Sequence, residues 1–249
     1  MLKGKTAIVT GGTRGIGFAI VEKYLENGAN VAVAGSRQES VDKALSKLSG
    51  YEGRVVGIWP DLCDPKAVAK AFADVKDRFG SLDILANNAG VSSRTSLYEY
   101  TLDEFSKIMD LNVKAVFVCS QAAARIMKDQ GGGVIINTSS MVGEYGQPSG
   151  CGYPASKFAV NGLTRSLARE LAKDHIRVNA VAPGVTRTDM VSALPKELVD
   201  RISAGIPLGR VGEHAKSGGR SGLLLPDGNT SVHRDGLFDG SSRPLSALD

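Results

Sequence analysis

The chain has 249 residues, of which 42% are hydrophobic and 22% are charged, and its formal net charge is +4. This composition is typical of a folded globular protein and excludes general disorder. The 30 Lys and Arg residues are scattered and form no basic stripe, so nucleic acid is not an expected partner. The three cysteines lack C-x-x-C spacing and the three histidines lack metal-ligand spacing, so we expect neither disulfides nor a metal.

The sequence also leads us to expect a soluble, cytoplasmic protein. The start MLKGKTAIVTGG passes directly into a strand-like run, which leaves no room for a signal peptide. No apolar run approaches the length needed to span a bilayer, so a membrane is not an expected partner either. Cys119 lies in the apolar stretch KAVFVCSQAAA and is expected to be buried as a small hydrophobic residue.

Six nearly continuous apolar runs predict strands covered on both faces: KTAIVTG from Lys5, NVAVAG from Asn30, RVVGIWP from Arg54, LDILANNAG from Leu82, GVIINTSS from Gly133 and IRVNAVAPG from Ile176. Helical periodicity separates them, for example from Val68 through Phe79, which ends at Gly80. This alternation predicts an α/β fold with a doubly wound parallel sheet and a ligand site at the carboxyl ends of the strands.

The first predicted strand runs into TGGTRGIG, where Gly11, Gly15 and Gly17 are spaced G-x-x-x-G-x-G and a helical pattern follows at once. A glycine turn here lets the backbone approach a pyrophosphate and directs the amino end of the helix at its charge. Glycines alone are weak evidence, because every tight turn favours them. Their position at the first strand-to-helix junction favours dinucleotide binding.

The end of the second predicted strand bears on which dinucleotide is bound. An acidic side chain there would bind the ribose 2′-hydroxyl and repel a 2′-phosphate. This chain has Ser36 and Arg37 instead, and Arg14 lies within the glycine loop. Each arginine alone could be a solvated surface charge, but together their guanidinium groups favour NADP over NAD.

The ends of the next two strands offer further cofactor contacts. Asp61 could accept a hydrogen bond from an adenine amino group, and the small residues from Asn88 to Gly90 would let a nucleotide pass close. Asx and Gly also end strands in ordinary turns. Their position at successive strand ends favours the cofactor interpretation.

The stretch YGQPSGCGYPASK holds two tyrosines, of which the second is the better candidate for a catalytic residue. Tyr153 and Lys157 lie at i and i+4 on one face of a helix predicted to begin near Tyr153. A tyrosine hydroxyl titrates near ~10 in isolation, so it needs a cation such as Lys157 to stabilise its phenolate. Tyr145 has no such partner and is expected to be a packing or pocket-wall residue. Ser139 and Ser140 close the fifth strand, where a serine could hold a substrate oxygen or only form a turn.

Several of these motifs, taken in order, resemble the classical short-chain dehydrogenases/reductases. The similarity extends roughly from Lys3 to Arg210. It rests on the T-G-x-x-x-G-x-G loop from Thr10, the N-N-A-G motif from Asn87, a serine thirteen residues before Y-x-x-x-K, and the later A-P-G from Ala182. The resemblance implies a single-domain Rossmann fold and a homo-oligomer, either a tetramer or a dimer.

The resemblance also implies a catalytic tetrad of Asn112, Ser140, Tyr153 and Lys157. Tyr153 would be the general acid or base for hydride transfer between the nicotinamide and a carbonyl carbon, and Ser140 would position the oxygen. Lys157 would hold the ribose and lower the pKa of Tyr153, while Asn112 would help to carry a water that relays protons. Ser140 is preferred to Ser139 because only Ser140 has the family's spacing to Tyr153.

The residues that we expect to contact the cofactor come from the strand ends and from a loop that the resemblance assigns to the nicotinamide. They are Gly11, Thr13, Arg14, Gly15, Ile16, Gly17, Ser36, Arg37, Asp61, Leu62, Asn88, Ala89, Gly90, Tyr153, Lys157, Pro183, Gly184, Val185 and Thr188.

The middle of the chain resembles 3-oxoacyl-acyl-carrier-protein reductases, which makes such a reductase the first expectation. It also resembles bacterial hydroxysteroid dehydrogenases that act on bile acids, so a ketone or alcohol on a steroid is the alternative. Two other classes are a dinucleotide-binding regulator without catalysis and a structural subunit of a reductase assembly. The complete tetrad argues against the regulator.

Residues 1–212 are expected to form the core, including a substrate lid with an amphipathic helix near 188–210. Residues 213–249 are rich in Gly and Ser and depart from the family's usual ending. We interpret this segment as an altered or misread ending that is disordered in part. A well-packed helix between Glu213 and Leu225 would contradict that hypothesis.

Overall fold

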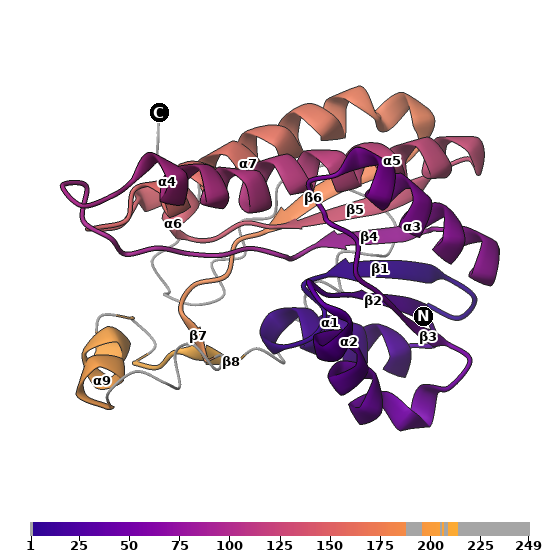
Figure 1. Ribbon diagram of the computed structural model, residues 1–249, viewed down its shortest axis with the longest axis horizontal. Coiled ribbons are helices and arrows are strands. Elements are labelled where there is room, and N and C mark those ends of the chain that lie inside the picture. Colours follow the sequence, from indigo (N-terminus) through magenta and orange to yellow (C-terminus); the bar gives the residue numbers. More distant parts are fainter. Residues whose placement is uncertain (1, 188–195, 205, 207–208, 214–249) are drawn as a thin grey trace.

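The computed structural model describes residues 2–187, 196–204, 206 and 209–213 (Figure 1). Its main sheet has six strands in the order β3-β2-β1-β4-β5-β6, and all neighbouring pairs are parallel. The strands are β1 (Thr6–Thr10), β2 (Asn30–Ala34), β3 (Val55–Ile58), β4 (Ile84–Asn87), β5 (Gly133–Thr138) and β6 (Ile176–Val181). The predicted doubly wound sheet is confirmed, and its strand order reverses between β1 and β4.

Helices cover both faces of the sheet (Figure 1). Those on one face are α3 (Pro65–Phe79), α5 (Ala115–Asp129) and α7 (Gly152–Glu170), and those on the other are α1 (Gly15–Glu26) and α2 (Gln38–Leu45). In β1, Ile8 packs into the first layer, whereas Ala7 and Val9 pack into the second. Successive strand residues point to opposite faces, so a strand covered on both sides must be apolar throughout.

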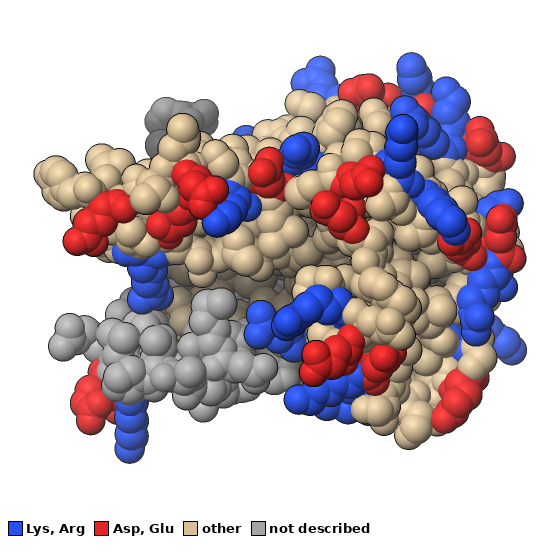
Figure 2. Space-filling model, in the orientation of Figure 1, with Lys and Arg blue, Asp and Glu red and all other residues tan. Residues whose placement is uncertain are grey.

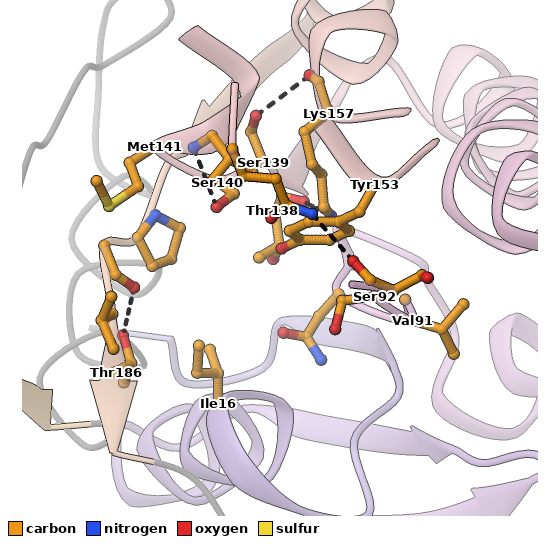
Figure 3. Close-up of a pocket in the computed structure, with 18 of the residues that line it drawn as sticks. Ile16, Val91, Ser92, Thr138, Ser139, Ser140, Met141, Tyr153, Lys157 and Thr186 are labelled. Carbon is orange, nitrogen blue, oxygen red and sulfur yellow. Dashed lines mark hydrogen bonds between the residues drawn. The ribbon is translucent and has the colours of Figure 1, made fainter. Parts of the chain in front are cut away.

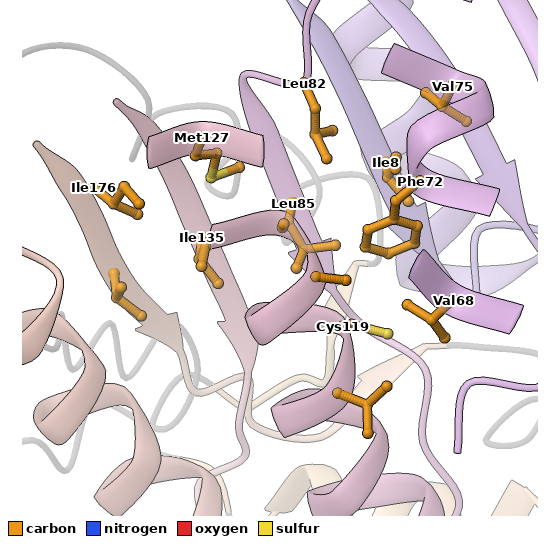
Figure 4. Packing of buried hydrophobic residues seen from close by; sticks show 14 of the residues in the cluster. Ile8, Val68, Phe72, Val75, Leu82, Leu85, Cys119, Met127, Ile135 and Ile176 are labelled. Carbon is orange, nitrogen blue, oxygen red and sulfur yellow. The ribbon is translucent and has the colours of Figure 1, made fainter. Parts of the chain in front are cut away.

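The larger core cluster lies under α3 and α5 (Figure 4). Phe72 of α3 and Met127 of α5 pack there against Leu85 and Ile135 of the sheet, and all four side chains are buried. Cys119 belongs to the same cluster, where burial raises its pKa to about 12. Its predicted role as a small buried hydrophobic residue is confirmed.

Local sequence signals explain where α3 begins and ends. The Asp64 carboxylate accepts hydrogen bonds from the backbone N–H groups of Lys66 (2.8 Å) and Ala67 (3.4 Å), which caps the amino end. Gly80 ends the helix with a left-handed φ of 89°, a conformation that glycine adopts without strain. The end predicted at Gly80 is confirmed.

The register of the sheet places the carboxyl ends of its strands at one edge. Asn87, the last residue of β4, is paired with Asn137 of β5, and Thr138 at the end of β5 is paired with Val181 at the end of β6. Residues that follow these strands therefore meet at one edge, although they are far apart in the chain.

Shorter elements complete the described part of the fold. They are η1 (Ser46–Tyr51), α4 (Leu102–Met109), the π-helix η2 (Asp110–Lys114), α6 (Val142–Tyr145), η3 (Ala172–Asp174), β7 (Thr186–Arg187), α9 (Lys196–Ala204) and β8 (Gly212–Glu213). Helix α9 lies within the segment predicted to form a lid. Residues 188–195 of that segment, and the tail from 214 onward, lie outside the described residues. None of the described helices is long and apolar enough to cross a membrane.

Candidate active site

The glycine loop forms a tight turn between β1 and α1. Gly11 and Gly15 have φ values of 63° and 56°, in the left-handed region that disfavours a side chain. A Cβ atom on Gly17 would overlap the carbonyl oxygen of Gly11, so the helix can approach the turn only if residue 17 is glycine. The amino end of α1 therefore opens onto the carboxyl edge of the sheet, as a pyrophosphate site requires.

The end of β4 holds this turn in place. The Asn88 side-chain amide donates to the carbonyl oxygens of Thr10 (3.2 Å) and Gly11 (3.3 Å). The Thr10 hydroxyl accepts from the backbone N–H groups of Asn88 (2.9 Å) and Ala89 (3.0 Å). Asn88 was predicted as a cofactor contact, and its amide group also shapes the loop on which the cofactor would rest.

The two arginines expected to favour NADP, Arg14 and Arg37, have no acidic partner among the described residues. Arg14 precedes α1 and Arg37 precedes α2; both are exposed, and neither forms an ion pair with a carboxylate of the described residues. Figure 2 shows basic side chains over the region of α1 and α2, beside the hollow of the molecule. Asp61 is exposed, and its carboxylate accepts from the backbone N–H of Cys63 at 2.9 Å. Leu62 packs against the larger core cluster.

A cavity of 310 Å³ lies at the carboxyl edge of the sheet (Figure 3). Ser140, which follows β5, and Tyr153 and Lys157 of α7 line one side of it. Ile16 of α1 and Thr186 of β7 lie across the cavity from them (Figure 3). The structure thus brings together three of the four predicted catalytic side chains.

The two serines after β5 point to different partners. The Ser140 hydroxyl accepts a hydrogen bond from the backbone N–H of Val142 at 3.4 Å, so its own proton stays available on the cavity wall beside Tyr153, whereas the Ser139 hydroxyl donates to the backbone carbonyl of Lys157 at 3.4 Å. Ser140 is therefore the serine that can share a substrate oxygen with Tyr153, in agreement with the family spacing.

Lys157 is buried beside the tyrosine ring. Its Nζ atom donates to the carbonyl oxygen of Thr138 at 2.7 Å and lies 5.7 Å from the centre of the Tyr153 ring. Burial lowers the pKa of Lys157 to about 8, because the charged ammonium loses hydration.

The pKa of Tyr153 is set mainly by burial. The loss of hydration raises this pKa, and the neighbouring Ser140 side chain opposes the rise. The lowering of this pKa that we expect from Lys157 is not tested by the net shift and stays a prediction. A raised pKa keeps Tyr153 protonated at neutral pH.

Asn112 lies behind the cavity wall in the π-helix η2. Its amide oxygen accepts from the backbone N–H of Val91 (2.9 Å), and its amide nitrogen donates to the Val91 carbonyl (2.8 Å) and to the Ser156 hydroxyl (2.9 Å). The buried side chain holds the loop after β4 against α7. Asn112 is not among the residues that line the cavity, and its expected part in carrying a water stays a prediction.

A buried chain of hydrogen bonds supports the strands beneath the cavity. The Asn87 amide donates to Asn137 Oδ1 (2.9 Å) and to the Ser120 hydroxyl (3.0 Å), and the Asn137 amide donates to the Thr164 hydroxyl (2.9 Å). These hydrogen bonds link α5 and α7 to β4 and β5. Sequence reasoning did not assign these four residues to the site, although Asn87 lies in the N-N-A-G motif.

The predicted cofactor residues divide into two sets. Those that line the cavity are Ile16, Asn88, Gly90, Tyr153, Lys157, Pro183, Gly184 and Val185. Those that lie elsewhere along the carboxyl edge are Gly11, Thr13, Arg14, Gly15, Gly17, Ser36, Arg37, Asp61, Leu62 and Ala89. Thr188 lies outside the described residues.

Sequence reasoning missed one wall of the cavity. It is formed by Val91 to Arg94, together with Gln147 from the loop before α7. The polar run Ser92, Ser93, Arg94, one residue after N-N-A-G, was the available signal. Tyr145, expected to pack or to line the pocket, is 65% exposed and is not among the lining residues, so that expectation is wrong. It is the last residue of the short helix α6.

Fold and cavity together define a class of protein. A doubly wound parallel sheet with a glycine turn after its first strand, and with Ser, Tyr and Lys at its carboxyl edge, is the framework of a dinucleotide-dependent oxidoreductase. The family model described as short chain dehydrogenase matches residues 5–198. The chain belongs to the short-chain dehydrogenase family, whose members use a nicotinamide dinucleotide.

Characterised relatives span almost the whole chain. It is 66% identical over 215 residues to a 3alpha-hydroxysteroid dehydrogenase of Mediterraneibacter gnavus, which covers 86% of each chain. It is 40% identical over 225 residues to the 3-oxoacyl-acyl-carrier-protein reductase FabG of Staphylococcus aureus, covering 90% of this chain and 91% of that one. The crystal structure of a short-chain type dehydrogenase/reductase from Mycobacterium marinum matches with a TM-score of 0.83 and 38% identity, over 88% of this chain and 87% of that one.

Proposed function

We propose that the chain is an NADP(H)-dependent hydroxysteroid dehydrogenase, which interconverts a secondary alcohol and a ketone on a steroid. The observation that supports the reaction is the single cavity that Ser140, Tyr153 and the buried Lys157 line together. The steroid class is supported by the 66% identity to a 3alpha-hydroxysteroid dehydrogenase, compared with 40% to the acyl-carrier-protein reductase.

The residues of the carboxyl edge fit a dinucleotide. A pyrophosphate would be held at the turn of Gly11, Gly15 and Gly17, where side chains are excluded and the first turn of α1 has no acidic residue. NADP rather than NAD is favoured because Arg14 and Arg37 lack acidic partners among the described residues and can bind a 2′-phosphate. When bound, the nicotinamide supplies or accepts a hydride at the carbon that bears the substrate oxygen.

Residues of this chain bind the substrate oxygen and transfer its proton. Ser140 donates a hydrogen bond to the substrate oxygen and holds it beside the Tyr153 hydroxyl. In reduction Tyr153 donates its proton to that oxygen, which suits a phenol whose pKa is raised by burial. In oxidation Tyr153 accepts the proton from the alcohol.

Lys157 and Asn112 support this pair. Protonated Lys157 lies near the Tyr153 ring and favours the phenolate that forms after proton donation. Asn112 acts through its contacts with Val91 and Ser156, which fix the cavity wall beside Tyr153.

A 3-oxoacyl thioester is the second candidate substrate, supported by the similarity to FabG. The test is the rate of NADPH oxidation with a 3-ketosteroid and with acetoacetyl coenzyme A. We expect kcat/KM to be larger for the ketosteroid by about tenfold or more. A larger kcat/KM for the thioester would make the 3-oxoacyl thioester the preferred candidate substrate. NADPH binding without reduction of any carbonyl would favour a dinucleotide-binding regulator without catalysis.

We also propose that the chain forms a homo-oligomer in the cytoplasm. Phe117 of α5 and Phe158 of α7 are 46% and 50% exposed, and a second copy could cover both. Light scattering should give a mass that is a multiple of the chain mass of 26.1 kDa, and Phe117→Glu with Phe158→Glu should reduce it. A monomeric wild-type chain would refute the proposal.

A further inference from the structure

The loop that follows β4 is anchored on one side by a carboxylate. Glu104 of α4 accepts hydrogen bonds from the hydroxyls of Ser93 and Thr95, the latter at 2.8 Å. The Ser93 hydroxyl oxygen lies 3.1 Å from that of Thr95, and it accepts a hydrogen bond from the Thr95 backbone N–H, also at 3.1 Å. The backbone on either side of Arg94 is thereby fixed, and Glu104 is engaged with the two hydroxyl groups.

The same loop is anchored from the opposite side by the segment before α7. The Gln147 amide donates to the carbonyl oxygens of Ser93 (3.0 Å) and Gly150 (2.9 Å). Gly150 has a φ of 74°, and a Cβ atom there would overlap the Ser93 carbonyl and press on the Arg94 backbone. Arg94 is therefore held between the α4 and α7 segments at a defined place on the cavity wall.

Arg94 brings a positive charge to the cavity. It lines the cavity and is exposed, and it forms no ion pair within the part of the chain that the structure describes. The described lining residues include no Asp or Glu, and Lys157 is their only other charged side chain. Lys157 is buried and bonded to Thr138, so Arg94 is the cation there that a ligand can reach from solvent.

We propose that Arg94 is a specificity-determining residue that binds an anionic group on the substrate, remote from the reacting carbonyl. A guanidinium group binds carboxylates, sulfonates and phosphates through paired charge-assisted hydrogen bonds. The apolar residues Val91, Met141 and Val142 line the same cavity and suit the hydrocarbon part of such a substrate. This inference rests on the proposed function and narrows its substrates to ketones or alcohols that carry an anion.

The anion has two possible sources, which the experiment separates. In the steroid arm, a 3-ketosteroid with a carboxylate-terminated side chain is compared with its neutral methyl ester. In the thioester arm, acetoacetyl coenzyme A, which carries phosphates, is compared with neutral acetoacetyl N-acetylcysteamine. A preference confined to one arm identifies the carboxylate or the phosphate as the ligand.

The variant Arg94→Ala should lower kcat/KM for the anionic member of a pair by about tenfold and change it less than about twofold for the neutral member. Arg94→Lys should restore part of the preference, and added salt should reduce it in the wild-type enzyme because the group is exposed. Arg165→Ala, which removes an exposed arginine from α7, is the matched control and should preserve the preference.

Equal losses on charged and neutral substrates, or no loss on either, would overturn the role of Arg94 while leaving the proposed function intact. If no ketone is reduced, the proposed function fails, and binding decides the inference. Calorimetry with the NADPH-loaded protein would then compare the steroid carboxylate with its ester. Tenfold weaker binding of the carboxylate to Arg94→Ala supports the inference, and equal binding refutes it.

Discussion

Lys157 of helix α7 donates a hydrogen bond of 2.7 Å to the carbonyl oxygen of Thr138, the last residue of strand β5. This bond ties the helix that carries Tyr153 to the strand that precedes Ser140, and it holds the ammonium group 5.7 Å from the centre of the Tyr153 ring. The hydrogen bond between Lys157 and Thr138 therefore fixes the distance between Tyr153, to which we assign proton transfer, and Ser140, to which we assign binding of the substrate oxygen.

Removal of the Tyr153 hydroxyl should abolish most of the activity. We expect Tyr153→Phe to lower kcat by about 100- to 10,000-fold, because this variant has no proton donor beside Ser140. NADPH affinity, measured by fluorescence titration, should change little. Tyr145→Phe is the control, since Tyr145 is 65% exposed and outside the cavity lining. Activity of Tyr153→Phe close to that of the wild type would refute the assignment.

The buried Lys157 should make stability depend on pH. Its pKa is lowered from 10.5 to about 8 by burial, so between these values the unfolded chain binds a proton that the folded chain has released. Stability must then rise with pH through this window, because the unfolded state binds more protons. The rise attributable to Lys157 is up to about 3 kcal/mol in the free energy of unfolding.

Urea denaturation of the wild type and of Lys157→Met at several pH values isolates this effect. Other groups whose pKa differs between the folded and unfolded chain, such as the buried Tyr24, whose pKa is raised by burial, are common to both chains and cancel in the difference. The wild type should gain stability relative to Lys157→Met as pH rises from about 7 to about 10. A difference in stability between the two chains that does not change with pH would show that burial does not lower the pKa of Lys157.

Two glycines in helices should respond to alanine in opposite ways. Gly17→Ala places a methyl group against the Gly11 carbonyl, so it should destabilise the chain by about 2 kcal/mol or more and abolish NADPH binding. Gly162 lies on α7, and no atom is within 4 Å of the methyl group that alanine would add there. Because alanine favours a helix more than glycine does, Gly162→Ala should stabilise the chain by about 0.5–1 kcal/mol. Thermal unfolding and NADPH titration check both, and normal binding by Gly17→Ala would contradict the assigned turn.

The choice of cofactor should depend on Arg37. Arg37→Asp should weaken NADPH binding by about 10- to 100-fold, because a carboxylate replaces the partner of the 2′-phosphate. NADH has no such phosphate and should be affected less than about threefold. Arg37 precedes helix α2, and Lys43 is an exposed residue in the last turn of that helix. The charge reversal Lys43→Asp therefore controls for a general electrostatic effect. Equal losses for both cofactors would show that Arg37 does not select NADP.

Much of the fold could be predicted because its signals are local. Apolar runs covered on both faces marked the strands, and Gly80 marked the end of α3 where a left-handed residue is required. The Asn112 contacts could not be predicted, because both of the residues that it binds, Val91 and Ser156, are more than twenty residues away in sequence. The clamp of Gln147 on Ser93 was missed for the same reason.

The sequence by itself determined the alternation of strands and helices, the glycine turn, and the spacing of Ser140, Tyr153 and Lys157, because these depend on backbone geometry and on helical period. Only the tertiary structure decided that the Ser139 hydroxyl bonds to the Lys157 carbonyl, that burial raises the pKa of Tyr153, and that Arg94 lines the cavity without an acidic partner among the described residues. Hydration and charge depend on what surrounds a group in space, and residues from distant segments create those surroundings only when the parallel strands align at one edge.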